Sequence, residues 1–266
     1  MPEGIAFRRI VAVSAWLGIA FLLFPVAFTF AASLGPSQFI EFPPAGLSLR
    51  WYENIARINR VVDATLVSLG VALLAGAFAA VLGAAAALAL VRLPLPGKAA
   101  VTSLLLSPIA LPIVAIGIAL IQFFILLGVA FTWWSLVIGH LVLVLAYPVR
   151  TVAASLTLSN PSLEEAAASL GATPWQVFRT VTLPQMAPGM VSGFLFAFLI
   201  SFDNYPISIF LVRGDLTTLP IELFNYISQN LDPTPAAFSS VYVAVVAVLI
   251  WLAERRFRIV SLSIPR

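Results

Sequence analysis

Long stretches without a charged residue divide the chain into segments of bilayer length. Such stretches occupy residues 10–40, 64–91, 99–149, 180–202 and 233–253, and the third is long enough for two spans that meet near residues 128–132. The stretches are rich in Leu, Ala and Val and lack two-residue alternation, so they predict helices and not strands. We expect an all-α membrane protein with six transmembrane helices, at approximately 10–33, 64–91, 104–127, 132–149, 187–211 and 236–253.

The composition excludes a soluble enzyme and most kinds of catalytic site. Hydrophobic residues make up 61% of the chain and charged residues 9%, whereas soluble domains carry about a quarter charged residues. Cysteine is absent and His140 is the single histidine, so we predict no catalytic residue and no metal site. The net charge of +3 is small and dispersed, so no nucleic-acid partner is expected.

Basic residues lie unequally on the two sides of the predicted spans. With the N-terminus inside, ten are inside (Arg8, Arg9, Arg92, Lys98, Arg150, Arg179, Arg255, Arg256, Arg258 and Arg266) and four are outside (Arg50, Arg57, Arg60 and Arg213). The positive-inside rule therefore predicts that both termini are cytoplasmic. This orientation places segment 151–184 in the cytoplasm, and segments 34–60 and 212–235 outside, within a single transmembrane domain of residues 1–266.

Small residues in the second span predict close helix packing, and prolines in the third span predict an irregular helix. Gly76, Ala80 and Ala84 recur every four residues, so another backbone can approach one face of the second helix closely. This face suits either static helix packing or a sliding surface between two halves of a transporter. Pro108 and Pro112 predict a bend or a late start in the third span.

The cytoplasmic segment contains signals for two short helices around a glycine. Ser162 and Glu165 have capping-box spacing, Glu164 favours the first turn, and Gly171 can take the left-handed conformation that ends a helix. Residues 173–176 then give a second start signal, with Pro at the first helical position.

Pro184 is expected to end the second helix of this hairpin. The residues of the hairpin allow two interpretations of its role. The hairpin could lie on the membrane through Trp175, Val177 and Phe178, or its small, acidic surface could insert into a groove on a partner.

One motif in this segment resembles a known family. Glu165-Ala166-Ala167, Gly171, Val181 and Leu183-Pro184 have the spacing of the EAA loop of ABC importer permeases, E-A-A-x3-G-x9-I-x-L-P, with Val181 in place of Ile. The resemblance implies a type I ABC importer permease architecture in a bacterial-type inner membrane. It also implies that the ATPase-coupling residues are Glu164, Glu165, Ala166, Ala167 and Gly171.

The same resemblance implies a set of partners. They are a homologous permease subunit, which would be a different chain, an ATPase dimer and an extracytoplasmic solute-binding protein. ATP and Mg would be bound by the ATPase, with no cofactor in this chain. The chain's single lysine, in Gly97-Lys98-Ala99, lacks the flanking residues of a Walker A sequence, so this chain is not expected to be an enzyme.

Further segments resemble the second permease of spermidine/putrescine-type systems. They are residues 42–52, 201–210 and 218–220 with the stretch that follows. Asn204 stands where these relatives often carry a second acidic residue, which leaves other small solutes or iron as an alternative cargo. The resemblance implies an importer for a small organic, polyamine-like cation.

Four adjacent residues are candidates for the solute pathway: Phe202, Asp203, Asn204 and Tyr205. Asp203 would attract a cation, and Phe202 and Tyr205 could add cation–π contacts. Asp203 could instead cap a helix that restarts before Pro206.

Two other classes of membrane protein lack the residues that they would need. An ion-coupled secondary transporter would use several intramembrane acids and internal repeats, and an intramembrane enzyme would need more catalytic material than His140. His140 itself is either a hydrogen-bonded packing residue or a proton relay.

Overall fold

The computed structural model describes residues 3–257, which form helices joined by loops. The helices are α1 (Glu3–Ser33), α2 (Arg50–Arg57), α3 (Asn59–Arg92), α4 (Lys98–Ala110), α5 (Ile113–Leu126), α6 (Trp133–Val144), α7 (Ala146–Leu158), α8 (Ser162–Ser169), α9 (Pro174–Val177), the π-helical turn η1 (Phe178–Thr182), α10 (Leu183–Phe202), α11 (Tyr205–Leu211), α12 (Leu219–Gln229) and α13 (Thr234–Phe257). In the described range, β pairing is limited to an isolated bridge between Arg213 and Leu216. The predicted all-α class is confirmed.

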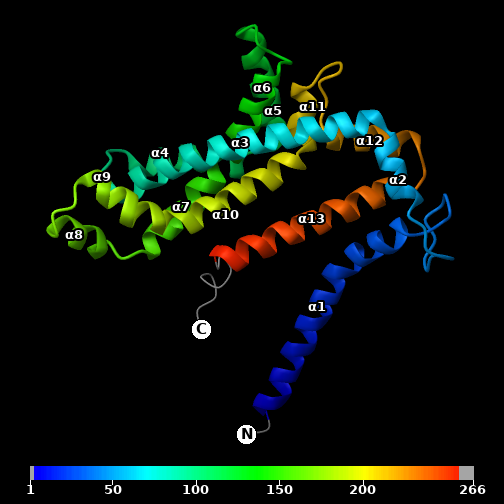
Figure 1. Ribbon diagram of the computed structural model, residues 1–266, viewed down its shortest axis with the longest axis horizontal. Helices are drawn as coiled ribbons and strands as arrows, with labels where there is room; N and C mark the ends of the chain where they lie inside the picture. The colour runs from blue at the N-terminus through cyan, green and yellow to red at the C-terminus, as the bar shows by residue number, and fades with distance from the viewer. Residues whose placement is uncertain (1–2, 258–266) are drawn as a thin grey trace. The chain divides into compact units, whose positions relative to one another are not determined.

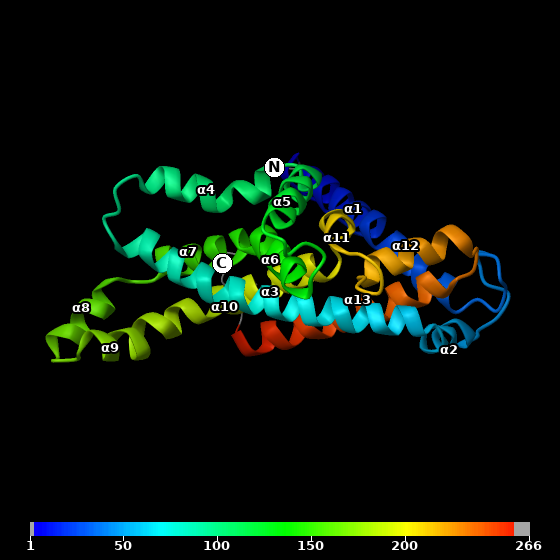
Figure 2. The same ribbon diagram turned by 90° about the horizontal axis from the view of Figure 1, so that it is seen from above.

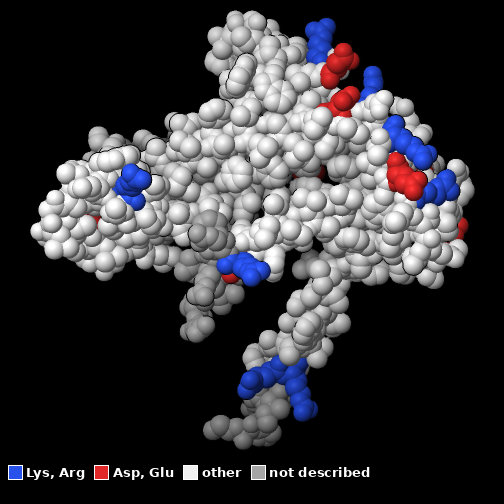
Figure 3. All heavy atoms as spheres, viewed as in Figure 1, with Lys and Arg blue, Asp and Glu red and all other residues white. Residues whose placement is uncertain are grey.

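Five of the six predicted spans have a helical counterpart of sufficient length and hydropathy. Five candidate spans are Phe7–Ser33, Asn59–Arg92, Trp133–Leu158, Pro174–Phe202 and Thr234–Arg255, and the bent pair Lys98–Ala110 and Ile113–Leu126 gives a sixth if it crosses as one unit. On the face drawn in Figure 3, charged side chains gather in a few places and wide uncharged areas lie between them. Arg258 and Arg266, counted in the charge argument, lie outside the described residues.

The third span is not the single helix 104–127 that the sequence predicts. It begins at Lys98 and breaks into α4 and α5, which are bent by 107°. Leu111 is extended (φ −88°, ψ 148°) because a residue that precedes proline avoids the helical region. Pro112 then stands at the N-cap of α5, so the bend predicted from the prolines is confirmed.

The fourth span runs further than predicted and shortens the cytoplasmic connection. Helix continues through Arg150 to Leu158, so the first eight residues of segment 151–184 are helical. Arg150 is exposed, so its charge needs no buried partner. A charged residue ends the apolar stretch of the sequence, but it does not interrupt the backbone hydrogen bonds of the helix.

The fifth span, predicted as one helix over 187–211, is interrupted near its end and starts earlier. α10 ends at Phe202 and α11 begins at Tyr205. The prediction that Pro184 ends the preceding helix is wrong, because η1 leads from α9 directly into α10 and proline falls in the first turn of α10. The Leu183 N–H bonds to the carbonyl of Phe178, five residues back, so a π-type turn carries the helix up to Pro184 without ending it.

Contacts group the chain into two compact units, residues 1–62 with 223–249 and residues 63–222 with 250–266. In the second unit, α10 runs along α3 and α7 (Figures 1 and 2). A Cβ added at Gly76 of α3 would lie 3.3 Å from the ring of Phe194, and one added at Gly189 would lie 2.8 Å from the Cα of Val152. The small-residue face of α3 therefore packs on α10 within this chain, with Ala80 and Ala84 buried.

In the first unit, the segment after α1 folds back on the helix ends. The indole of Trp51 donates a 2.7 Å hydrogen bond to the carbonyl of Gly35 and is buried. The Nδ2 of Asn54 donates to the Oγ1 of Thr234 at 2.9 Å. Residues 34–60 are thus held to α13 and are not a free loop.

Candidate functional site

The predicted cytoplasmic hairpin is present as α8 and α9 around Gly171. Gly171 has φ 87°, a left-handed conformation that glycine adopts without steric cost. The second start signal is confirmed as a capping box: the side chain of Gln176 accepts from the Thr173 N–H at 2.7 Å, and the Thr173 hydroxyl accepts from the Gln176 N–H at 3.4 Å.

The first start is at the predicted residue but uses a different cap. Pro161 takes the N-cap position with helical angles, so Ser162 is the first helical residue and the predicted Ser162–Glu165 box is absent. The Oδ1 of Asn160 accepts from the Ser162 N–H at 3.1 Å instead. Glu165 therefore takes no part in the cap, and it is exposed.

The outer surface of the hairpin combines an acid with small and apolar side chains. Glu165, Ala166 and Gly171 are exposed and Ala167 is half-buried. Leu170 is 89% and Trp175 66% exposed. Neither α8 nor α9 has a buried residue, which leaves this surface open to another molecule.

Glu164 behaves differently from the other four predicted coupling residues. Its Oε1 accepts a 3.1 Å hydrogen bond from Arg92, the last residue of α3, and its side chain is 21% exposed. From the sequence, Arg92 is only one of the predicted inside charges, and Ser159 is not predicted to have a functional role. The guanidinium of Arg92 also contacts Ser159. No local signal could have paired Arg92 with a residue 72 positions away.

The predicted solute-pathway residues lie at the break between α10 and α11, but they face different ways. Asp203 is exposed, Tyr205 is half-buried, and Phe202 and Asn204 are buried. The Oδ1 of Asn204 accepts from the Ile207 N–H at 3.0 Å and is the N-cap of α11. The prediction that Asp203 caps the restarted helix is therefore wrong, and its carboxylate stays available for another role.

His140 joins both sides of this break. It is buried on α6, its Nδ1 lies 2.8 Å from the Oγ of Ser201 on α10, and its Nε2 lies 3.1 Å from the Oγ of Ser208 on α11. These contacts support the packing interpretation of His140. Among the described residues, no cluster of three or more His, Asp or Glu could hold a metal ion.

Comparison with known proteins adds to this geometry. Residues 79–261 match the family model of the binding-protein-dependent transport system inner membrane component. A putrescine transport system permease protein of Escherichia coli (strain K12) is 31% identical, over 89% of this chain and 86% of its own length. A spermidine/putrescine transport system permease protein of Haemophilus influenzae (strain Rd) is 28% identical, over 79% and 81%.

A solved structure shares the fold. It is a bacterial ABC transporter involved in the import of the acidic polysaccharide alginate, with a TM-score of 0.72 over 97% of this chain and 98% of that chain. The sequence identity is 13%, so this likeness concerns the fold alone.

Proposed function

Because the chain belongs to the family of inner membrane components of binding-protein-dependent transport systems, and is a permease subunit of an ABC importer, we propose how it couples ATP to solute movement. The observation that carries the proposal is the exposed hairpin α8–α9, whose outward acid and small residues match the EAA pattern. Glu165, Ala166, Ala167 and Gly171 dock in a cleft of the ATPase. ATP and Mg are bound in that separate subunit.

The membrane arrangement is a single permease domain of six spans with both termini in the cytoplasm. Segment 151–184 faces the ATPase dimer, and segments 34–60 and 212–235 face the solute-binding protein. A second, homologous permease subunit completes the pathway. The inside excess of basic residues and the six apolar helical segments support this arrangement.

The solute is a small polyamine-like cation. Relatives at 31% and 28% identity are named for putrescine and spermidine/putrescine transport. Asp203 offers an exposed carboxylate at a helix break beside the half-buried Tyr205, and a carboxylate with an aromatic ring suits an ammonium group. Asn204 is uncharged and supports the pathway by capping α11, which fixes the helix start next to Asp203.

Transport by the reconstituted complex tests this function. The chain is assembled with its permease partner, ATPase dimer and binding protein in liposomes, and uptake of labelled putrescine is measured with and without ATP. Uptake that needs ATP and binding protein is expected. Glu165→Lys should abolish stimulation of the ATPase while assembly persists, because a reversed charge faces the docking cleft.

The solute assignment has its own measurement in the same liposomes. Asp203→Asn should raise the KM for putrescine about tenfold, the equivalent of ~1.4 kcal/mol, with an unchanged yield of complex. Asp63→Asn, an exposed acid at the start of the second unit, is the matched control. An unaltered KM in Asp203→Asn would remove this residue from the pathway.

A further inference from the structure

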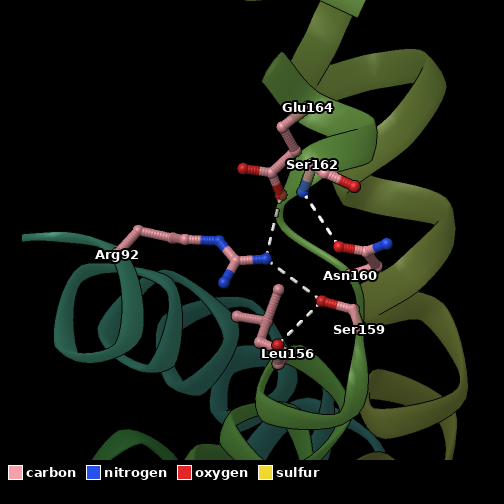
Figure 4. A network of polar contacts seen from close by, with 6 residues as sticks. All are labelled: Arg92, Leu156, Ser159, Asn160, Ser162 and Glu164. Atoms are coloured by element: carbon pink, nitrogen blue, oxygen red, sulfur yellow. Dashed lines mark hydrogen bonds and ion pairs between the residues drawn. The ribbon is translucent and has the colours of Figure 1, made fainter. Parts of the chain in front are cut away.

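Arg92 joins the ends of three helices through one nitrogen atom. Its Nη2 donates to the Oε1 of Glu164 and to the Oγ of Ser159, each at 3.1 Å (Figure 4). Arg92 ends α3, Glu164 lies in the first turn of α8, and Ser159 directly follows α7. The contact therefore ties the coupling hairpin to the second and fourth spans.

The Arg92–Glu164 contact is partly shielded from water. The two side chains are 20% and 21% exposed, whereas those of the Arg57–Glu53 pair on α2 are 76% and 67% exposed. Exposed pairs contribute little because water screens them. Removing one member of a shielded pair is more costly because it leaves the other charge without compensation.

No residue of α8 is buried against α3. A cavity of about 570 Å³ lies between them, lined among others by Ala89, Arg92, Glu164 and Phe178. A buried apolar cluster of Ala84, Ala87, Val152, Leu156 and Met186 belongs to α3, α7 and α10, and Phe178, which follows α9, packs against it. Since α8 contributes no buried residue, the hydrogen bond between Arg92 and Glu164 is the described contact that joins α8 to α3 directly.

We propose that Arg92 and Glu164 are positioning residues that make α8 move together with α3 when the ATPase displaces the hairpin. This inference rests on the proposed function. The two neighbouring acids then have separate tasks, because Glu165 faces outward to the ATPase while Glu164 faces inward to the protein's own span.

The geometry of the contact predicts which substitutions it tolerates. The Nε of Arg92 is buried and has no hydrogen-bond partner among the described residues, so the guanidinium engages Glu164 through a single terminal nitrogen. Lysine can supply one charged nitrogen, although it cannot donate the paired hydrogen bonds of a guanidinium. Arg92→Lys should therefore keep the function that Arg92→Gln loses.

The experiment measures putrescine uptake per ATP hydrolysed in the reconstituted complex. Arg92→Gln and Glu164→Gln should each lower this ratio about tenfold, as expected for loss of a charge-assisted hydrogen bond. Arg92→Lys should stay within about twofold of the wild type. The double variant Arg92→Glu with Glu164→Arg exchanges the two charges. Its uptake per ATP should be higher than that of Arg92→Glu alone or of Glu164→Arg alone. Arg150→Gln, an exposed cation on α7, is the control.

The ratio separates positioning from simple stabilisation. A purely structural role would reduce the yield or the Tm of the complex and leave uptake per ATP unchanged, and that result would overturn the proposal. A double reversal no better than the single reversals would also overturn it. Failure of the proposed function is distinct, because the wild-type complex would then show no ATP-driven uptake.

A covalent link gives a second, independent readout. The chain contains no cysteine, so Arg92→Cys with Glu164→Cys can be joined selectively by a bifunctional thiol reagent. Linking should raise uptake per ATP above that of the unlinked double variant, because the link restores joint movement of α3 and α8. A further decrease on linking would show that the contact must open during transport and would contradict the proposal.

Discussion

At the scale of single residues, His140 holds the broken fifth span together. Its two ring nitrogens contact hydroxyls on either side of the break, on α10 and α11. Alanine would leave Ser201 and Ser208 without this partner and open a cavity, at a cost of about 2–4 kcal/mol. We expect His140→Ala to lower the Tm of the purified complex by several degrees.

A nearby residue provides the control for His140. Ile138 lies on the same helix and is 44% exposed, so Ile138→Ala should change the Tm far less. If His140 were instead a proton relay, His140→Ala would alter the pH dependence of uptake and leave the Tm near the wild-type value. That pattern would contradict the packing role.

The residue that caps a helix could be predicted from the sequence only where the neighbouring residues offered a single candidate. Thr173, Pro174 and Gln176 agree on one helix start, and the structure shows that start. At the first helix, Pro161 takes the cap position ahead of Ser162, and Asn160 supplies the acceptor. At the break, Asp203 and Asn204 are both acceptable caps, and the sequence offered no means of choosing between them.

At the scale of elements, close packing of α7 on α10 depends on glycine. A Cβ added at Gly189 would lie 2.6 Å from the Ser155 Oγ and 2.7 Å from the Thr151 carbonyl oxygen. The two helices would have to separate, and such overpacking costs about 1–3 kcal/mol. Gly189→Ala should therefore lower the Tm of the complex.

Gly18 of α1 serves as the matched substitution. A Cβ added there meets nothing within 4 Å among the described residues, and alanine favours helix over glycine. Gly18→Ala should leave the Tm unchanged or raise it slightly. Equal losses from both substitutions would show that the effect of Gly189→Ala does not come from the contact between α7 and α10.

The existence of the spans could be predicted from the sequence more reliably than their ends. Charge-free stretches locate apolar helices, because a bilayer span needs about 20 apolar residues. They do not locate helix ends, since α7 passes through Arg150, and the helix that includes α10 begins at Pro174, before the charge-free stretch 180–202. Prolines identified the bend at Pro112 but gave a false stop at Pro184, where η1 leads into α10.

At the scale of the whole molecule, the contacts between distant elements could not be predicted from the sequence. Arg92 and Glu164 are 72 positions apart, and His140 and Ser201 are 61 positions apart. Each pair depends on how the spans pack, and no periodicity or local motif encodes it. The hairpin motif was recognisable because its residues are adjacent in the chain, whereas its attachment to α3 became visible only in the folded structure.

Membrane orientation is the whole-molecule property on which the proposed coupling depends. The positive-inside rule predicts that the α8–α9 hairpin lies in the cytoplasm and α12 outside. Because the chain has no cysteine, Leu170→Cys and Asn225→Cys, both at exposed positions, can report the two sides separately. In intact spheroplasts, a membrane-impermeant thiol reagent should label residue 225, while residue 170 should react only after permeabilisation. Labelling of residue 170 alone would place the hairpin on the side without ATP, where docking on an ATPase is impossible.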